Sequence, residues 1–382
     1  MDGGRANEAV APGALPPQAG TIPQLTALRF FAAFVVMLSH LDFLEANASP
    51  VVGGTYTLFL HQGFCGVSFF YVLSGFIISH AYRDRLAAGR IGTGTYLYHR
   101  LTRIMPLHWL TALLFAGWLT IAQADPPRLT TLLLNLGLLH AWFPAMTIHY
   151  SLNGPSWSLS DELFFYMAFI PLVRVPVRGL CWIAALGAAV IAGLALISAL
   201  TVEGYSNLAE WFFYVNPATR LLEFVTGMIL YDAWRSGRGR RFATTRVEAA
   251  LILAVPAAMV GFAVSDVPMP FRYQLAWLPL MAALVLVFAH GRGGVTRLLR
   301  TRLLVLLGEA SFALYLTHRP IITLAHQLAG DPAQGWRDVA LALLLVPLCA
   351  VVSILVFLNF ERPVLRWSRG GRRTRRMDAP AM

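Results

Sequence analysis

Ten long apolar runs dominate the hydrophobic pattern of the chain, and polar positions gather in the short segments between them. A helix needs about 20 mostly apolar residues to cross the roughly 30 Å of hydrocarbon in a bilayer, so we interpret each run as a membrane-crossing helix. The pattern predicts an all-α integral membrane protein with about ten transmembrane helices. The runs fall near residues 24–44, 62–81, 104–123, 159–173, 180–201, 217–234, 248–265, 273–290, 303–327 and 339–360.

An eleventh apolar run, 129–143, is short and ends at Pro144. Its length suits a segment that enters the membrane and turns back, or one that lies in the interface, better than a full crossing. We therefore expect a short re-entrant or interfacial helix near 129–143.

Composition supports a membrane-embedded chain. Apolar residues make up 57% of the 382 residues and charged residues only 13%, whereas about a quarter of an average soluble protein is charged. Such a chain cannot cover a water-facing surface, which excludes a disordered protein, a secreted disulfide scaffold and a soluble enzyme. The three cysteines lie far apart inside apolar runs, without metal-ligand spacing, so no metal site is expected.

The placement of arginine predicts the orientation, because cytoplasmic loops of membrane proteins carry an excess of basic residues. The chain has no lysine; with the N-terminus inside, 24 of its 30 arginines fall in cytoplasmic segments and three in outer connections. A full crossing by 129–143 would move the later arginine clusters outside. Ten spans with both termini in the cytoplasm therefore satisfy the rule.

The same pattern divides the chain into three parts. Residues 1–20 are rich in Gly, Pro and Ala and are interpreted as a disordered tail, 21–361 form the transmembrane domain, and 362–382 form a basic cytoplasmic tail. The net charge is +11. We interpret it as a consequence of membrane topology and of contact with anionic lipids, and we expect no nucleic-acid partner.

Ionisable residues inside apolar runs are costly, which makes them candidates for function. Arg29 and His40 lie eleven residues apart in the first run. Eleven residues of helix turn about 20° beyond three full turns and rise roughly 16 Å, so both side chains project from one face. The alternative is a snorkelling arginine and a histidine satisfied within the core.

Two further clusters lie at the ends of predicted spans. Arg100 and Arg103 are three residues apart and so lie side by side on a helix, where two guanidinium groups suit phosphate oxygens; the alternative is a role in topology alone. Ser158 and Glu162, four apart, follow Trp157 at the start of the fourth run. Helix capping explains one acidic residue there, but not Glu162 continuing into apolar sequence.

Small and hydroxyl residues also occur inside the runs. The stretch Gly66–Phe76, which includes Ser74, favours close helix packing. Ser311, Tyr315 and His318 share one face of the ninth run at spacings of four and seven residues.

In chain order, five motifs together resemble the membrane-bound acyltransferase family 3, which includes bacterial O-antigen, exopolysaccharide and macrolide acyltransferases. The resemblance extends from about residue 24 to 360, and one departure is His108, where the family often has an aromatic residue. The motifs are Arg29-x10-His40, the Gly66–Phe76 stretch, Arg100-x-x-Arg103-Ile-x-Pro106, Ser156-Trp157-Ser158-x-x-x-Glu162 and Ser311-x-x-x-Tyr315-x-x-His318.

The resemblance implies transfer of an acyl group, most often acetyl from acetyl-CoA as co-substrate with no bound cofactor, to a sugar hydroxyl. The acceptor would be an exopolysaccharide, another surface glycan or a lipid-linked oligosaccharide, at the outer side of a bacterial inner membrane. The residues expected to act are His40, Glu162 and Ser158 in catalysis, Arg29, Arg100 and Arg103 in donor binding, and Trp157, Ser74, Tyr315 and His318 in support.

Neutral histidine suits general-base catalysis near pH 7, and Glu162 could orient its imidazole as the acid does in a triad. On this hypothesis His40 and Glu162 lie together near the outer face, and a conduit connects them to the arginines at the inner face. A covalent acyl-histidine is an alternative mechanism. Alternative functions are acylation of a small molecule such as a macrolide and glycolipid transport without chemistry.

Overall fold

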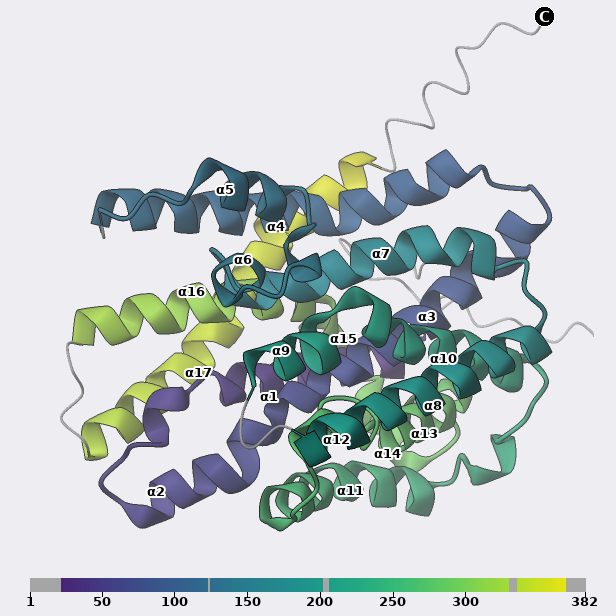
Figure 1. Ribbon diagram of the computed structural model, residues 1–382. Coiled ribbons are helices and arrows are strands. Elements are labelled where there is room, and N and C mark those ends of the chain that lie inside the picture. Colours follow the sequence, from purple (N-terminus) through teal and green to yellow (C-terminus); the bar gives the residue numbers. More distant parts are fainter. Residues whose placement is uncertain (1–21, 123, 202–205, 330–334, 369–382) are drawn as a thin grey trace, which may run out of the picture.

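A computed structural model describes residues 22–122, 124–201, 206–329 and 335–368, and all regular secondary structure in these ranges is helical (Figure 1). The all-α prediction is therefore confirmed. The predicted tail 1–20 lies outside the described residues, as does most of the predicted tail 362–382.

Each of the ten predicted runs contains a helix. The longer helices are α1 (Pro23–Ser39), α3 (Cys65–Ala87), α4 (Thr93–Ala122), α7 (Trp157–Leu172), α8 (Val177–Thr201), α10 (Pro217–Arg235), α11 (Thr245–Val264), α13 (Leu278–His290), α16 (Ser311–Ala329) and α17 (Trp336–Val356). The shorter ones are α2 (Pro50–Thr55), α5 (Leu129–Leu136), α6 (Met146–His149), α9 (Asn207–Glu210), α12 (Met269–Arg272), α14 (Gly294–Leu299) and α15 (Arg302–Glu309).

Within the described ranges, five helical segments are long and apolar enough to cross a membrane, namely Pro50–Ala87, Thr93–Ala122, Val177–Thr201, Thr245–Val264 and Trp336–Ser368. Shorter apolar helices, α1 and α13, pack among them. The count of ten crossings and the cytoplasmic placement of the termini stay predictions.

One predicted element is divided, and another is shorter than its apolar run. The run 303–327 is two helices rather than one, because α15 ends at Glu309 and α16 begins at Ser311, whose hydroxyl donates to the carbonyl of Gly308 (2.8 Å). A side-chain bond to a nearby backbone carbonyl competes with the continuous helical ladder. In 129–143 a short helix, α5, does form beside α4, where the Trp109 indole donates to the carbonyl of Leu136 (3.0 Å).

The centre of the fold is a crossing of α3 and α10, with α1 packed between α3, α15 and α16 (Figure 1). Gly75 and Gly227 meet at this crossing, and a Cβ at either position would overlap a backbone oxygen of the other helix. Glycine therefore allows the two backbones to approach directly. The close packing places the apolar stretch Gly66–Phe76 in the core, as the sequence predicts.

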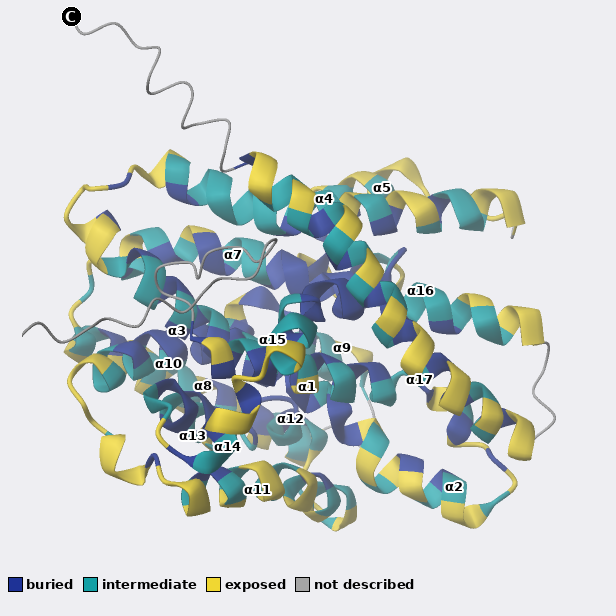
Figure 2. Ribbon diagram, turned by 180° about the vertical axis from the view of Figure 1, so that it is seen from behind, coloured by how far each residue is buried: buried dark blue, intermediate teal, exposed yellow. Residues whose placement is uncertain are grey.

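Exposed residues are concentrated on the outer helices, including α11 and α17 (Figure 2). Many large side chains on α8, α11 and α17 are exposed, including Trp182, Leu186, Leu253 and Leu343, whereas most residues of α3 are buried. Exposed apolar faces of this extent indicate contact with lipid. The central helices consequently hold the polar side chains away from hydrocarbon.

Candidate active site

A cavity of about 130 Å³ lies between α1, α3, α4, α7 and α16. Most of the residues expected from the motifs line it, although they come from five separate helices. The lining residues are Arg29, Val67, Phe70, Tyr71, Leu73, Ser74, Ile77, Ile78, Arg100, Arg103, Ile104, Ser158, Leu159, Glu162, Tyr166, Ser311, Phe312 and Tyr315.

Three arginines converge on this cavity. Arg29 comes from α1, while Arg100 and Arg103 come from adjacent turns of α4, as their spacing predicts. Glu162 is the one carboxylate in the lining, so positive charge is in excess. A concentration of guanidinium groups around one cavity attracts an anionic ligand.

Aromatic rings and one carboxylate hold the two arginines of α4. The guanidinium of Arg100 lies 5.2 Å from the ring centre of Tyr82 and 5.9 Å from that of Tyr166. Arg103 forms an ion pair with Glu361, beyond the end of α17, and lies 5.1 Å from the ring centre of Phe312. These contacts restrain the side chains while their charges still face the cavity.

Glu162 lies with the arginines rather than with His40, so the hypothesis that it orients the His40 imidazole is wrong. Tyr166 donates a hydrogen bond to Glu162, and Glu162 lines the same cavity as Arg29 and Arg100. The expectation failed because helix spacing gives the face on which Glu162 lies, whereas the packing of α7 against α4 decides which residues that face meets.

His40 instead pairs with a second histidine. At the C-terminal end of α1, its Nδ1 lies 3.3 Å from Nε2 of His318 on α16, and the ring centres are 4.9 Å apart. Arg29 shares the cavity with Ser311 and Phe312, also on α16. Both Arg29 and His40 therefore face α16, in agreement with the shared face predicted from their spacing.

Tyr315 lies beside both the cavity and the histidine pair. It lines the cavity, and its ring centre lies 6.1 Å from that of His318 and 5.8 Å from that of Phe70. Its hydroxyl donates to the carbonyl of Pro155 (3.3 Å). Tyr315 therefore contacts both the cavity and the ring of His318.

The remaining predicted residues have structural contacts. Ser158, which lines the cavity, donates its hydroxyl proton to the carbonyl of Pro155 (3.0 Å). Trp157 is 4% exposed and packs on Tyr214 at 4.7 Å between ring centres, so it is not a lipid-facing anchor. Ser74 lies in the cavity wall.

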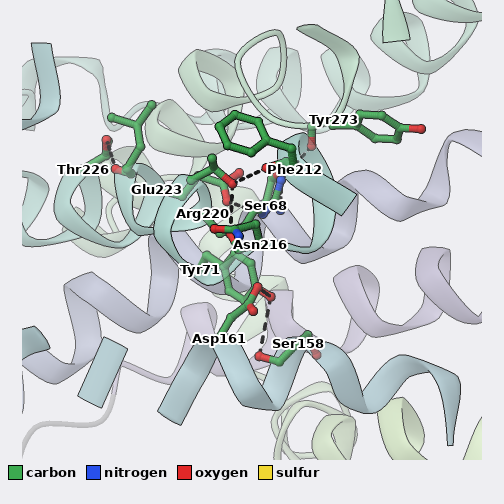
Figure 3. A network of polar contacts seen from close by, with 12 residues as sticks. Ser68, Tyr71, Ser158, Asp161, Phe212, Asn216, Arg220, Glu223, Thr226 and Tyr273 are labelled. Carbon is green, nitrogen blue, oxygen red and sulfur yellow. Dashed lines mark hydrogen bonds and ion pairs between the residues drawn. The ribbon is translucent and has the colours of Figure 1, made fainter. Parts of the chain in front are cut away.

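From the sequence we did not predict the buried charged network that adjoins the cavity (Figure 3). Arg220 and Glu223 of α10 form an ion pair at 3.1 Å, with both side chains fully buried. The Arg220 guanidinium donates to the carbonyl of Tyr273 (2.8 Å) and lies 4.9 Å from the ring centre of Tyr71, whose hydroxyl donates to buried Asp161 (2.6 Å).

This network had a signal in the sequence. Arg220 and Glu223 are three residues apart inside an apolar run, the arrangement of a paired intramembrane charge. Asp161 lies within the motif that includes Ser158 and Glu162. Because Tyr71 is also a cavity residue, the network connects α10 and α7 to the cavity wall.

Fold and site together describe a helical membrane protein with an arginine-rich cavity next to a pair of histidines. Residues 22–358 match the family model described as "Acyltransferase domain". The chain belongs to this acyltransferase family and is an enzyme, which confirms the resemblance found in the sequence.

Individual relatives agree with this assignment. The chain is 33% identical over 376 residues to acyltransferase MdmB of Streptomyces mycarofaciens, covering 92% of this chain and 94% of that protein. It is 31% identical over 341 residues to the exopolysaccharide production protein ExoZ of Rhizobium meliloti (strain 1021), covering 86% and 96%. It is 22% identical over 372 residues to peptidoglycan O-acetyltransferase OatA of Listeria monocytogenes, covering 90% of this chain and 56% of that protein.

No solved structure matches this chain.

Proposed function

We propose that this enzyme transfers an acetyl group from acetyl-CoA to a hydroxyl of a cell-surface glycan, an exopolysaccharide or a lipid-linked oligosaccharide, at a bacterial inner membrane. The observation that carries the proposal is the convergence of Arg29, Arg100 and Arg103 on one cavity, whose wall residue Tyr315 contacts the paired histidine His318. This arrangement suits a donor with an anionic end and a reactive thioester end.

On the donor side, the cavity suits phosphate-bearing ligands. Guanidinium groups bind phosphate oxygens through paired N–H donors, and burial strengthens those bonds relative to water. Arg103 is restrained by Glu361 and Arg100 by two tyrosine rings, so little side-chain entropy is lost when a ligand binds. Arg29 would hold the donor closer to the reacting centre.

On the reaction side, His40 acts as the base. As the sugar hydroxyl attacks the thioester carbonyl, the imidazole takes its proton, the carbon–sulfur bond breaks, and the proton passes to the departing thiolate. General-base catalysis of this kind contributes about 10²–10⁴-fold. We propose that the thioester passes Tyr315 on its way to His40, because this residue lines the cavity and contacts His318.

Support for a glycan acceptor comes from the relatives, since one is named for exopolysaccharide production and another for O-acetylation of peptidoglycan. Exposed aromatic side chains near the start of α7, Trp142 (38% exposed) and Phe143 (39% exposed), offer flat faces on which sugar rings stack.

The test uses full-length protein in proteoliposomes with radiolabelled acetyl-CoA and a polysaccharide or lipid-linked oligosaccharide acceptor. We expect labelled glycan and release of free CoA. His40→Ala should abolish both, whereas His326→Ala, a half-buried histidine elsewhere on α16, should leave them unchanged.

The donor site is tested with Arg100→Gln and Arg103→Gln, which should raise the KM for acetyl-CoA without changing the KM for the acceptor; Arg128→Gln, outside the cavity, is the control. Monodisperse elution and an unchanged unfolding midpoint confirm that each variant is folded. Full acetylation by folded His40→Ala, or movement of glycolipid without CoA release, would overturn the proposal.

A further inference from the structure

The two histidines pair in a geometry that selects one tautomer for each. In addition to their mutual contact, His40 Nδ1 lies 2.8 Å from the carbonyl oxygen of Val36, and His318 Nδ1 lies 3.0 Å from the carbonyl oxygen of Leu314. A carbonyl oxygen only accepts hydrogen bonds, so a ring nitrogen this close to it must carry a proton. Both imidazoles are therefore of the Nδ1–H form when neutral.

The contact between the rings then has a defined direction. His318 Nε2 carries a lone pair, and it faces Nδ1–H of His40 at 3.3 Å. The His40 proton is shared between the carbonyl of Val36 and this lone pair. The reverse assignment, with His318 donating, would place lone pairs of both Nδ1 atoms against carbonyl oxygens, at 2.8 and 3.0 Å, and is repulsive.

This arrangement leaves Nε2 of His40 as the basic nitrogen. His318 is fully buried, whereas His40 is partly exposed at the end of α1, so only His40 can meet a substrate. When Nε2 of His40 gains a proton, the ring becomes a cation and its Nδ1–H becomes a stronger donor. His318 Nε2, as a neutral acceptor, then stabilises the new charge.

We propose that His318 is a positioning residue that holds His40 in the Nδ1–H tautomer and stabilises the imidazolium formed during acyl transfer. The inference rests on the proposed function of His40, and it assigns to His318 the part expected of Glu162. No proton leaves His318: Nε2 of His40 takes the hydroxyl proton, returns it to the thiolate, and ends in its starting form. A transient acyl-histidine would need the same free Nε2.

The surroundings limit what else could stabilise the His40 cation. Arg319 lies 3.5 Å from the His40 carbonyl and pairs with Asp42 at 3.3 Å. The carboxylate of Asp42 is therefore paired with the guanidinium of Arg319 and not with the His40 ring. Among the described residues, His318 alone has a side chain hydrogen-bonded to the His40 ring, so its lone pair is the contact that responds to the ring charge.

The first test is the tautomer itself, which does not depend on activity. Protein labelled with ¹⁵N-histidine, with spectra assigned by comparison with His40→Ala, should show His40 protonated at Nδ1 and unprotonated at Nε2. A His40 ring protonated at Nε2 in the unmodified enzyme would overturn the proposal even if the enzyme transfers acetyl groups. Inactive enzyme with the expected tautomer would count against the proposed function instead.

The second test separates positioning from packing. His318→Leu removes the acceptor, and His318→Gln supplies a carbonyl oxygen in its place. We expect kcat to fall at least tenfold in His318→Leu with an unchanged KM for acetyl-CoA, and to recover largely in His318→Gln. Equal activity of folded His318→Leu and unmodified enzyme, or no difference between the two variants, would overturn the proposal.

Discussion

The buried ion pair between Arg220 and Glu223 allows a quantitative prediction. Arg220→Met leaves the Glu223 carboxylate fully buried without its cation and the carbonyl of Tyr273 without its donor. Removing one partner of a buried ion pair lowers the free energy of unfolding by about 3–5 kcal/mol. Glu223→Met leaves the opposite charge uncompensated and should cost a similar amount.

Replacing both partners with methionine should be much less harmful, because no unpaired charge then stays in the core. The carbonyl of Tyr273 still loses its donor, which costs about 1–3 kcal/mol. We therefore expect the double variant to be less destabilised than either single variant, with a favourable coupling energy of at least about 2 kcal/mol.

Unfolding by SDS titration in mixed micelles measures these differences, and a thiol-reactive dye reports unfolding through Cys65 and Cys349, which are buried and not disulfide-bonded. Cys181 is exposed and is replaced by alanine in the background. Two results would refute the reasoning about paired burial. One is that each single substitution lowers the free energy of unfolding by less than about 1 kcal/mol. The other is that the double variant lowers it by the sum of the two single effects.

Two further predictions use the same unfolding assay. Gly227→Ala places a Cβ against the carbonyl oxygen of Val72 and should destabilise the protein by about 1–3 kcal/mol; Gly193→Ala on α8, where the added atom meets nothing, is the control, and equal midpoints would contradict the close crossing. Burial raises the pKa of Glu210, in the segment between α8 and α10, above 4.5, and its hydrogen bond from Tyr150 only partly opposes this. The unfolded chain therefore loses the proton first, so stability should fall as pH rises above about 4.5 and level off beyond the folded pKa; Glu210→Gln should remove this dependence, and an unchanged pH profile would contradict it.

Much of the helical layout and part of the site could be predicted from local patterns. Each apolar run contains a helix, because runs of this length bury their backbone groups best as helices. Arg100 and Arg103 lie side by side in the cavity, since a spacing of three residues places them on one helix face wherever that helix packs. Arg29 and His40 face a common helix for the same reason.

Partners from distant segments could not be predicted this way. Glu162 meets arginines rather than His40, and His40 meets His318, which is 278 residues away in the chain. The break between α15 and α16 and the burial of Arg220 against Tyr71 likewise depend on packing between helices. Helical spacing defines the face on which each side chain lies, but it does not define the neighbouring helix.

The sequence alone determined the class of protein. Apolar composition shows that the chain lies in lipid, and short motifs place chemical groups on single helix faces, and neither depends on contacts between distant segments. The tertiary structure alone decided which groups meet: three arginines with Glu162 around one cavity, a histidine pair in contact with Tyr315, and a buried charged network joined to the cavity wall through Tyr71. The physical reason is that electrostatic and hydrogen-bond energies depend on distances of a few ångströms. These distances are set where helices from separate segments of the chain cross closely, as α3 and α10 do.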